Sequence, residues 1–283
     1  MERSILTAVS NQGKRRGDYS HANADYTVEQ DWPAYTAAEH SLWRKLYDRQ
    51  MRLAPQYACE EVLHTLDRLD LGGGIPRFDA ISRKLRRATG WALVAVPGLI
   101  PDLAFFEHLA NRRFPVTSWL RRPQEAEYIV EPDVFHDFFG HVPLLFDPVY
   151  ADYMAAYGAG GLKAARLDSL KHLARLYWYT VEFGLMRTRE GLRVYGAGLL
   201  SSAGEILYAA ESAEPRRVKF DLERLLRTEY RIDRFQDTYF VIDGFEQLIA
   251  DTEPDFTPVY ERIRRLPPIA ADEVTWDDVV ARR

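Results

Sequence analysis

Cysteine is almost absent from this chain of 283 residues, which contains only Cys59. One cysteine excludes an internal disulfide, and it also excludes zinc or iron–sulfur sites built from several thiolates. Such a composition suits a reducing compartment. We therefore expect a cytoplasmic protein without covalent cross-links.

Long hydrophobic runs are also missing. The longest apolar stretch, WALVAVPGLI at positions 91–100, is too short to span a bilayer and is interrupted by Pro97. Residues 1–26 contain no apolar core of signal-peptide length. We expect neither a membrane anchor nor a secretion signal.

The chain has no excess of positive charge. Its formal net charge is -5, and its arginine pairs, such as Arg121 with Arg122, are short and flanked by acids. An electrostatic nucleic-acid binder would need an extended basic surface. We therefore expect no nucleic-acid partner.

The chain does contain enough apolar material for one large core. Hydrophobic residues make up 47% of the sequence and charged residues 28%, and the length is near the upper limit of an undivided domain. Residues 1–30 are polar and lack periodicity, which predicts a loose N-terminal arm. Residues 31–283 show no repeat or linker and predict a single domain.

Hydrophobic periodicity predicts a mainly α protein with small β elements, an α+β fold. Gly158 is expected to end the helix that starts at Pro148. The predicted helices cover residues 37–53, 57–69, 76–85, 102–111, 148–157, 167–186, 203–211, 221–228, 244–251 and 258–266. The predicted strands cover residues 91–96, 114–119, 192–195 and 239–242, and a tight turn is expected at 196–198.

Local motifs mark the starts of several helices. Thr36 with Glu39 forms one capping box, and Ser202 with Glu205 forms a second. Asp147 stands as an N-cap residue before a proline at the first helical position.

Two histidines five residues apart, His136 and His141, stand in the segment EPDVFHDFFGHVPLLF, and Glu182 follows in a later segment. Two imidazoles and one carboxylate are the ligand set of non-haem Fe(II) oxygenases, which leaves coordination positions open. On an ideal helix, residues five apart point about 140° away from each other. We expect the chain to leave the helix near Gly140 and Pro143 and turn His141 inward. Two ordinary histidines remain the alternative on this spacing alone.

Three acids near these histidines allow more than one interpretation. Glu182 lies near the apolar stripe of the predicted helix 167–186, where a buried carboxylate needs a partner, either a metal cation or a salt bridge. Asp133 could cap the histidine segment or accept a ring N–H, and Asp137 directly follows the first histidine. Both aspartates could also be solvated surface acids.

Three segments together resemble the successive signature segments of the pterin-dependent aromatic amino acid hydroxylases. These are EPDVFHDFFGHVPLL, YWYTVEFGL and VYGAGLLSSAGE, and the similarity runs from Tyr35 to Tyr239. The resemblance implies the catalytic-domain fold of this family, mostly helical with small sheets, over residues 31–283. It also implies Fe(II), tetrahydrobiopterin or a related reduced pterin, dioxygen as co-substrate, and a free aromatic amino acid.

Site residues follow from the resemblance position by position. The metal ligands, which are also the catalytic centre, fall on His136, His141 and Glu182. The amino acid substrate falls beside Arg121, Trp178, Gly198, Ser201 and Ile232, and the pterin beside Phe105, Gly98, Leu99, Asp137 and Glu205. The residues alone also allow a purely structural interpretation. Trp178 and Phe105 would then be core aromatics, Arg121 would be a surface arginine and Ser202 would be a helix cap.

Two of these positions favour phenylalanine as the substrate. Tryptophan hydroxylases tend to have a smaller ring where Trp178 stands, and tyrosine hydroxylases tend to have an acid where Ile232 stands. An apolar Ile232 leaves a phenolic hydroxyl without a partner, which costs about 1–3 kcal/mol. The resemblance therefore implies conversion of L-phenylalanine to L-tyrosine.

Departures from the animal members indicate a compact bacterial type. Ile129 replaces a hydroxyl residue that animal members often place near the substrate carboxylate, and Asp137 stands where animal members have glutamate. The sequence also lacks the regulatory domain and tetramerisation helix of animal members, so a monomer is expected. The ligand set alone would also suit a zinc hydrolase or a catalytically silent metal-stabilised binding protein.

Overall fold

The first long helix begins where its capping box predicts. In the computed structural model, which describes residues 16–127, 129, 131–275 and 278, helix α1 covers Ala37–Tyr57. The Thr36 side chain accepts from the backbone N–H of Glu39, and the Glu39 carboxylate accepts from the backbone N–H of Thr36. The helix continues past its predicted end and includes Pro55 in its last turn.

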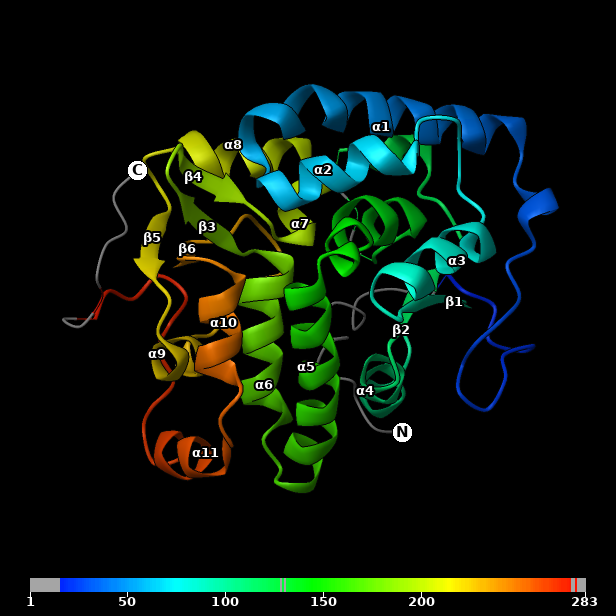
Figure 1. Cartoon of the computed structure of the whole chain (residues 1–283). Helices are drawn as coiled ribbons and strands as arrows, with labels where there is room; N and C mark the ends of the chain where they lie inside the picture. The colour runs from blue at the N-terminus through cyan, green and yellow to red at the C-terminus, as the bar shows by residue number, and fades with distance from the viewer. Residues whose placement is uncertain (1–15, 128, 130, 276–277, 279–283) are drawn as a thin grey trace.

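Helices are the main regular structure of the remaining chain, and short strands lie between some of them (Figure 1). The other helices are α2 (Glu60–Leu69), α3 (Phe78–Ala88), α4 (Asp102–Ala110), α5 (Pro148–Arg166), α6 (Leu170–Tyr177), α7 (Ala197–Leu200), α8 (Ala203–Glu211), α9 (Leu222–Arg227), α10 (Phe245–Thr252) and α11 (Thr257–Ile263). The strands are β1 (Ala92–Val96), β2 (Arg113–Thr117), β3 (Leu185–Thr188), β4 (Gly191–Val194), β5 (Arg216–Lys219) and β6 (Thr238–Ile242). The predicted mainly α fold with small β elements is confirmed.

The strands form two small sheets on either side of the central helices α5 and α6 (Figure 1). Strands β1 and β2 pair in parallel, from Ala92 opposite Arg113 to Val96 opposite Thr117. The second sheet has the order β4-β3-β6-β5, with β3 and β4 antiparallel and the other pairs parallel. Strands β3 and β5 were not expected from the sequence.

Helix α5 does not end at Gly158, so this prediction is wrong. The helix runs on to Arg166 because the glycine allows close packing against α4. A Cβ at position 158 would lie 2.3 Å from the backbone nitrogen of Ala110, and one at Gly161 would lie 2.0 Å from the Phe106 ring. Small residues at these two positions therefore let two helices approach closely.

We expect Gly158→Ala to lower the free energy of unfolding by about 1–3 kcal/mol, because the added methyl overlaps the backbone of α4. Gly160→Ala is the matched control in the same helix. Its Cβ meets nothing within 4 Å, and removing a glycine from a helix interior raises stability by about 0.5–1 kcal/mol. Urea unfolding checks both variants, and stabilisation by both would contradict the close packing.

Two other boundaries also differ from the expected ones. The helix predicted over 167–186 is regular only over α6, then widens into a π-helical turn at Trp178–Glu182 and gives way to β3. The segment 196–198 is not a tight turn, because the short helix α7 begins after Gly196. Both differences lie next to the candidate site.

Residues 16–30 lie against β1 and the loop that follows it. The N–H of Val28 donates to the carbonyl oxygen of Ala95 over 2.8 Å, and the Tyr19 hydroxyl donates to the carbonyl oxygen of Leu99 over 2.9 Å. The division into an arm over residues 1–30 and a domain over 31–283 stays a prediction, and residues 1–15 lie outside the described part.

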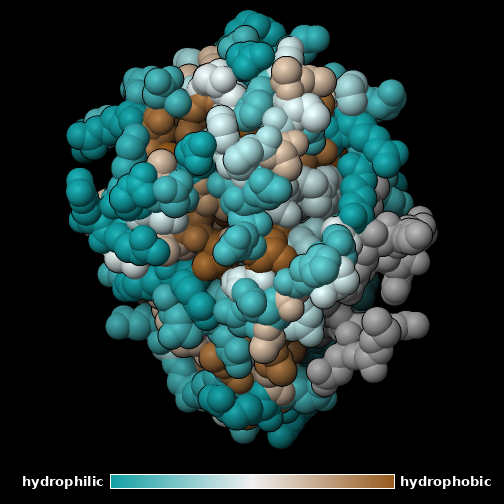
Figure 2. All heavy atoms as spheres, turned by 90° about the vertical axis from the view of Figure 1, so that its right-hand side faces the viewer, coloured by the Kyte–Doolittle hydropathy of each residue, from teal (hydrophilic) through white to brown (hydrophobic). Residues whose placement is uncertain are grey.

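Apolar side chains gather inside one core that extends under both sheets, and Trp43, Phe135 and Phe138 are among its fully buried rings. The face shown in Figure 2 is mostly hydrophilic, and apolar side chains show there between polar ones. In the described part of the chain, every helix falls short of the length and apolarity needed to cross a membrane.

Candidate active site

One cavity brings together every residue that the sequence analysis assigned to a metal, an amino acid or a pterin. Helices, loops and a π-helical turn from distant parts of the chain contribute to its wall. The assigned residues that line it are Gly98, Leu99, Phe105, Arg121, His136, Asp137, His141, Trp178, Glu182, Gly198, Ser201, Glu205 and Ile232. Their individual contacts with ligands stay predictions.

The two histidines share one side of the chain because their segment forms a π-helical turn, His136–His141. Hydrogen bonds in a π-helix join residues five apart, and here the N–H of Val142 donates to the carbonyl oxygen of Asp137 over 3.3 Å. Our expectation that the chain leaves the helix near Gly140 is wrong. The chain stays helical, and the wider turn places residues five apart on the same side.

Gly140 instead allows close packing against α7. A Cβ at this position would lie 2.7 Å from both the Cβ and the carbonyl oxygen of Ala197. On the other side of the π-helical turn, the rings of Phe135, Phe138 and Phe139 are fully buried. The turn is therefore held between the core and α7, which limits how far its histidines can move.

Glu182 lies at the end of a second π-helical turn, Trp178–Glu182. The N–H of Phe183 donates to the carbonyl oxygen of Trp178 over 2.9 Å, again across five residues. A Cβ at Gly196 would lie 2.5 Å from the carbonyl oxygen of Glu182. Helix α7 therefore packs against both turns, and a glycine permits the contact each time.

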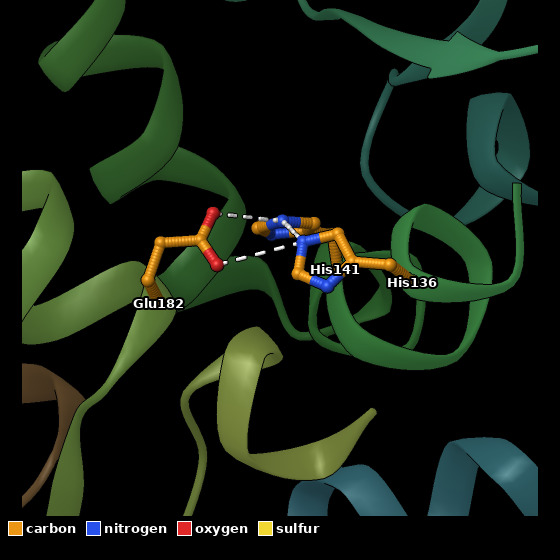
Figure 3. Close-up of side chains that lie close together, drawn as sticks. All are labelled: His136, His141 and Glu182. Carbon is orange, nitrogen blue, oxygen red and sulfur yellow. Dashed lines mark hydrogen bonds and ion pairs between the residues drawn. The ribbon is translucent and has the colours of Figure 1, made fainter. Parts of the chain in front are cut away.

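The three side chains converge on one point (Figure 3). Nε2 of His141 lies 3.2 Å from Oε1 of Glu182, and Nε2 of His136 lies 3.5 Å from Oε2. The two Nε2 atoms are 3.3 Å apart. Among the described residues, this is the only group of three or more histidine, cysteine or acidic side chains close enough to share a metal.

A hydrogen bond sets the tautomer of His136. The Ser201 hydroxyl donates to the carbonyl oxygen of Ala197 over 2.8 Å, so its oxygen accepts from Nδ1–H of His136, also over 2.8 Å. Nε2 then presents its lone pair to the centre of the cluster. Burial lowers the pKa of His136 to about 4, which keeps the imidazole neutral and able to bind a metal at neutral pH.

Glu182 is held in its charged form. Burial raises its pKa, but the imidazoles of His141 and His136 and hydrogen bonds from His141 and Tyr177 outweigh burial and leave the pKa below its usual value. A carboxylate and two imidazoles form a donor set that suits Fe(II) and leaves coordination positions open. Sequence reasoning did not identify Tyr177, although it directly precedes Trp178.

Asp133 is fully buried, and it has one of the two functions considered for it. It does not accept the ring N–H of His136, whose Nδ1 is hydrogen-bonded to Ser201. It accepts the backbone N–H of His136 over 3.0 Å, which caps the histidine segment. It also accepts from Nε and Nη2 of Arg121, both over 2.8 Å. Burial raises the pKa of Asp133, but the Arg121 charge and the hydrogen bonds from Arg121 and the N–H of His136 together outweigh burial and leave the pKa below its usual value. Neither Asp133 nor Arg121 is therefore a surface residue.

Trp178 forms part of an aromatic wall. Its ring stacks on Tyr230 at a centroid distance of 4.4 Å and an interplanar angle of 18°, and it lies 4.7 Å from the Phe183 ring. Its indole N–H donates to Oε1 of Gln236 over 2.9 Å. Sequence reasoning did not identify Tyr230 or Gln236, although both lie in the same loop as Ile232.

Three of the residues assigned to the pterin, Gly98, Leu99 and Phe105, lie in the loop after β1 and in α4, whereas Asp137 lies in the first π-helical turn and Glu205 in α8. Gly98 has a φ of 152°, and a Cβ there would lie 2.7 Å from a carboxylate oxygen of Glu131. The Phe105 ring meets Tyr177 edge to face at 5.7 Å. The carboxylate of Asp137 accepts from the N–H of Thr117 over 2.7 Å, and burial raises its pKa to about 7.

Glu205 does not complete the expected capping box. Ser202 accepts from the Glu205 N–H over 3.3 Å, as a cap should, but the Glu205 carboxylate turns away from it. Oε1 accepts from the N–H of Gln236 over 3.1 Å and from the hydroxyl of Tyr239 over 3.0 Å. Burial raises the pKa of Glu205 to about 7.

This raised pKa predicts a pH-dependent effect on stability. The folded protein binds the Glu205 proton more tightly than the unfolded chain does, so stability is lost as pH rises from the usual pKa through about 7. We expect Glu205→Gln, which keeps an acceptor oxygen, to raise the free energy of unfolding at pH 8 by roughly 1–3 kcal/mol. Urea unfolding should show the gain disappear near pH 4.5, and a gain independent of pH would contradict the burial effect.

Fold and site together define a helical enzyme class with a mononuclear metal centre of two histidines and one glutamate. The family described as biopterin-dependent aromatic amino acid hydroxylase matches residues 8–263. The chain belongs to this family.

Curated relatives and solved structures agree with this assignment. The chain is 60% identical to a phenylalanine-4-hydroxylase of Ralstonia nicotianae over 257 residues, which cover 90% of this chain and 82% of that protein. It is 52% identical to a phenylalanine-4-hydroxylase of Caulobacter vibrioides, covering 97% and 94% of the two chains. A crystal structure of phenylalanine hydroxylase from Chromobacterium violaceum with iron and phenylalanine bound has a TM-score of 0.89 at 52% identity, covering 99% of this chain and 100% of that one.

Proposed function

We propose that this chain is a phenylalanine 4-monooxygenase, which converts L-phenylalanine to L-tyrosine with dioxygen and a tetrahydropterin at a non-haem Fe(II). The observation that carries the proposal is the convergence of His136, His141 and Glu182 in a cavity with an aromatic wall. Two relatives named phenylalanine-4-hydroxylase, which are 60% and 52% identical to this chain, also support the proposal.

The donor set fits iron. Three ligands from two π-helical turns would hold one face of the metal, while the cavity occupies the other side. When bound, Fe(II) supplies the activation of dioxygen, together with the reduced pterin. The protein itself keeps His136 neutral, Glu182 charged and all three side chains in place.

We assign the amino acid to the side of the cavity formed by Arg121, Trp178 and Ile232, with Gly198 and Ser201 at its base. Asp133 occupies Nε and Nη2 of Arg121, and Nη1 is the guanidinium nitrogen outside this pair. The substrate carboxylate would meet this held cation. Trp178 and Ile232 offer apolar surface to the ring, which suits phenylalanine better than a substrate with a phenolic hydroxyl.

We assign the pterin to the side formed by Gly98, Leu99, Phe105, Asp137 and Glu205. The absence of a side chain at Gly98 lets Glu131 and Tyr19 pack against the loop after β1, and the Phe105 ring can stack on a flat heterocycle. Buried carboxyls such as Asp137 and Glu205 can meet the N–H groups of a pterin. Both have a pKa of about 7.

We further propose that residues 31–283 form one catalytic domain, that the protein is a cytoplasmic monomer, and that phenylalanine is its preferred substrate. Light scattering of the purified protein tests the monomer.

A competition assay tests the substrate. Iron-loaded protein receives tetrahydrobiopterin, oxygen and equal concentrations of phenylalanine, tyrosine and tryptophan, and products are separated by chromatography. Tyrosine formed from isotopically labelled phenylalanine should dominate. Preferential hydroxylation of tyrosine or tryptophan would overturn the substrate, and hydroxylation of none of them would overturn the proposed function.

A further inference from the structure

The Trp178 indole is held at three points. Tyr230 stacks on one face, Phe183 contacts the ring at 4.7 Å, and Gln236 accepts the indole N–H over 2.9 Å. The two ring contacts are apolar and allow the indole to slide, whereas the hydrogen bond to Gln236 requires a defined direction of the indole N–H. Gln236 is therefore the contact that fixes the rotation of the indole in its plane.

The same side chain also holds the loop that carries Ile232. Nε2 of Gln236 donates to the carbonyl oxygen of Arg231 over 2.9 Å, and Arg231 directly precedes Ile232. A carboxamide offers both an acceptor and donors. Gln236 is 2% exposed, so its bonds are protected from water. One buried amide thus connects the two positions that favour phenylalanine.

The backbone of Gln236 is fixed as well. Its N–H donates to Oε1 of Glu205 over 3.1 Å, and Tyr239 donates its hydroxyl to the same oxygen. Glu205 stands on α8 and Tyr239 on β6. The amide that contacts Trp178 is therefore anchored to a helix and a strand, not only to its own loop.

We propose that Gln236 is a positioning residue that couples the Trp178 wall to the Ile232 loop and so sets the amino acid selectivity of the cavity. The proposal rests on the proposed hydroxylase function. Loss of the coupling allows the indole to rotate and the loop to move, and the widened cavity then accepts tryptophan more readily.

The test compares Gln236→Met, which keeps the length of the side chain and removes both hydrogen bonds, with wild type. In an equal mixture of phenylalanine and tryptophan, the ratio of tyrosine to hydroxytryptophan should fall about tenfold, equivalent to losing one buried hydrogen bond. The KM for the pterin should stay within about twofold of wild type. An unchanged product ratio overturns the proposal.

Phe235→Leu is the matched control on the same loop. The Phe235 ring packs on Tyr208, away from the cavity. This variant should keep the wild-type product ratio, and an equal fall for both loop variants overturns a specific role of Gln236. If Gln236→Met does not fold, Gln236→Glu replaces it, because it lacks the donor for the Arg231 carbonyl and should shift the ratio in the same direction.

A double-mutant cycle with Trp178→Phe separates positioning from a general structural effect. When Trp178 is already absent, Gln236→Met should change the product ratio by less than about twofold. An equal tenfold fall in both backgrounds overturns coupling through Trp178.

Tryptophan fluorescence tests the same coupling without turnover in the four proteins of the cycle, which are wild type, the two single variants and the double variant. Gln236→Met should shift the emission where Trp178 is present and leave it unchanged in the Trp178→Phe background. If the wild-type protein hydroxylates no amino acid, only the proposed function is overturned. The fluorescence of the four proteins then decides whether Gln236 positions Trp178. An emission that does not respond to Gln236→Met overturns the positioning role.

Discussion

His141→Ala is expected to lose iron binding and tyrosine formation together. Nε2 of His141 lies 3.2 Å from Glu182 and 3.3 Å from Nε2 of His136, so its removal leaves two ligands for the metal. The remaining imidazole and carboxylate cannot form a facial set of three. Iron content by metal analysis and tyrosine by chromatography should both fall below detection, while wild type retains both.

His64→Ala is the control for this variant. His64 is exposed on α2, far from the cavity lining, and its loss should leave iron content and turnover at the wild-type level. Circular dichroism confirms that both variants are folded. Full tyrosine formation by His141→Ala would contradict the assignment of the metal ligands.

Asp133→Ala is expected to lower the free energy of unfolding by about 3–5 kcal/mol, because it leaves the buried Arg121 charge without its partner. The side chains of Arg121 and Asp133 are 3% and 0% exposed, and two hydrogen bonds of 2.8 Å join them. The variant also removes the cap on the N–H of His136. We therefore expect activity to fall with stability, since the histidine turn loses one of its supports.

Asp79→Ala provides the comparison for this effect. Asp79 pairs with Arg83 at 2.7 Å, but the two side chains are 65% and 61% exposed. An exposed pair of this kind contributes less than about 1 kcal/mol. Urea unfolding measures both variants, and a loss for Asp133→Ala as small as that for Asp79→Ala would show that solvent reaches Arg121.

Local signals in the sequence were sufficient for much of the fold. The Thr36 cap and the Asp147 cap depend on residues that interact over a few positions, and each is where the sequence predicts it. Strand β1 is also where its own apolar run predicts it. The end of α5 was predicted wrongly because Gly158 allows close packing against α4, and this contact cannot be predicted from the residues next to Gly158 in the sequence. Strand β5 was missed because its sequence, RRVK, has three charged residues and one apolar residue and so carries no strand pattern.

The candidate site likewise has features that the sequence predicts and features that depend on contacts between distant segments. The spacing of His136 and His141 was by itself a weak signal of a shared site. The local geometry expected for it was wrong, because a π-helical turn depends on packing against α7 and the core. Resemblance to a family located the cavity residues through their motifs. Gln236 and Tyr230 belong to no such motif, and only the folded chain brings them to Trp178.

The most direct test of the proposed function is the oxygen dependence of tyrosine formation. Protein loaded with Fe(II) under anaerobic conditions receives tetrahydrobiopterin and phenylalanine, and tyrosine is measured before and after oxygen is admitted. We expect no tyrosine before oxygen is admitted, and afterwards tyrosine formation accompanied by oxidation of the pterin. A zinc hydrolase would act without oxygen, and a silent metal-binding protein would take up metal without oxidising the pterin. Either result would contradict the account.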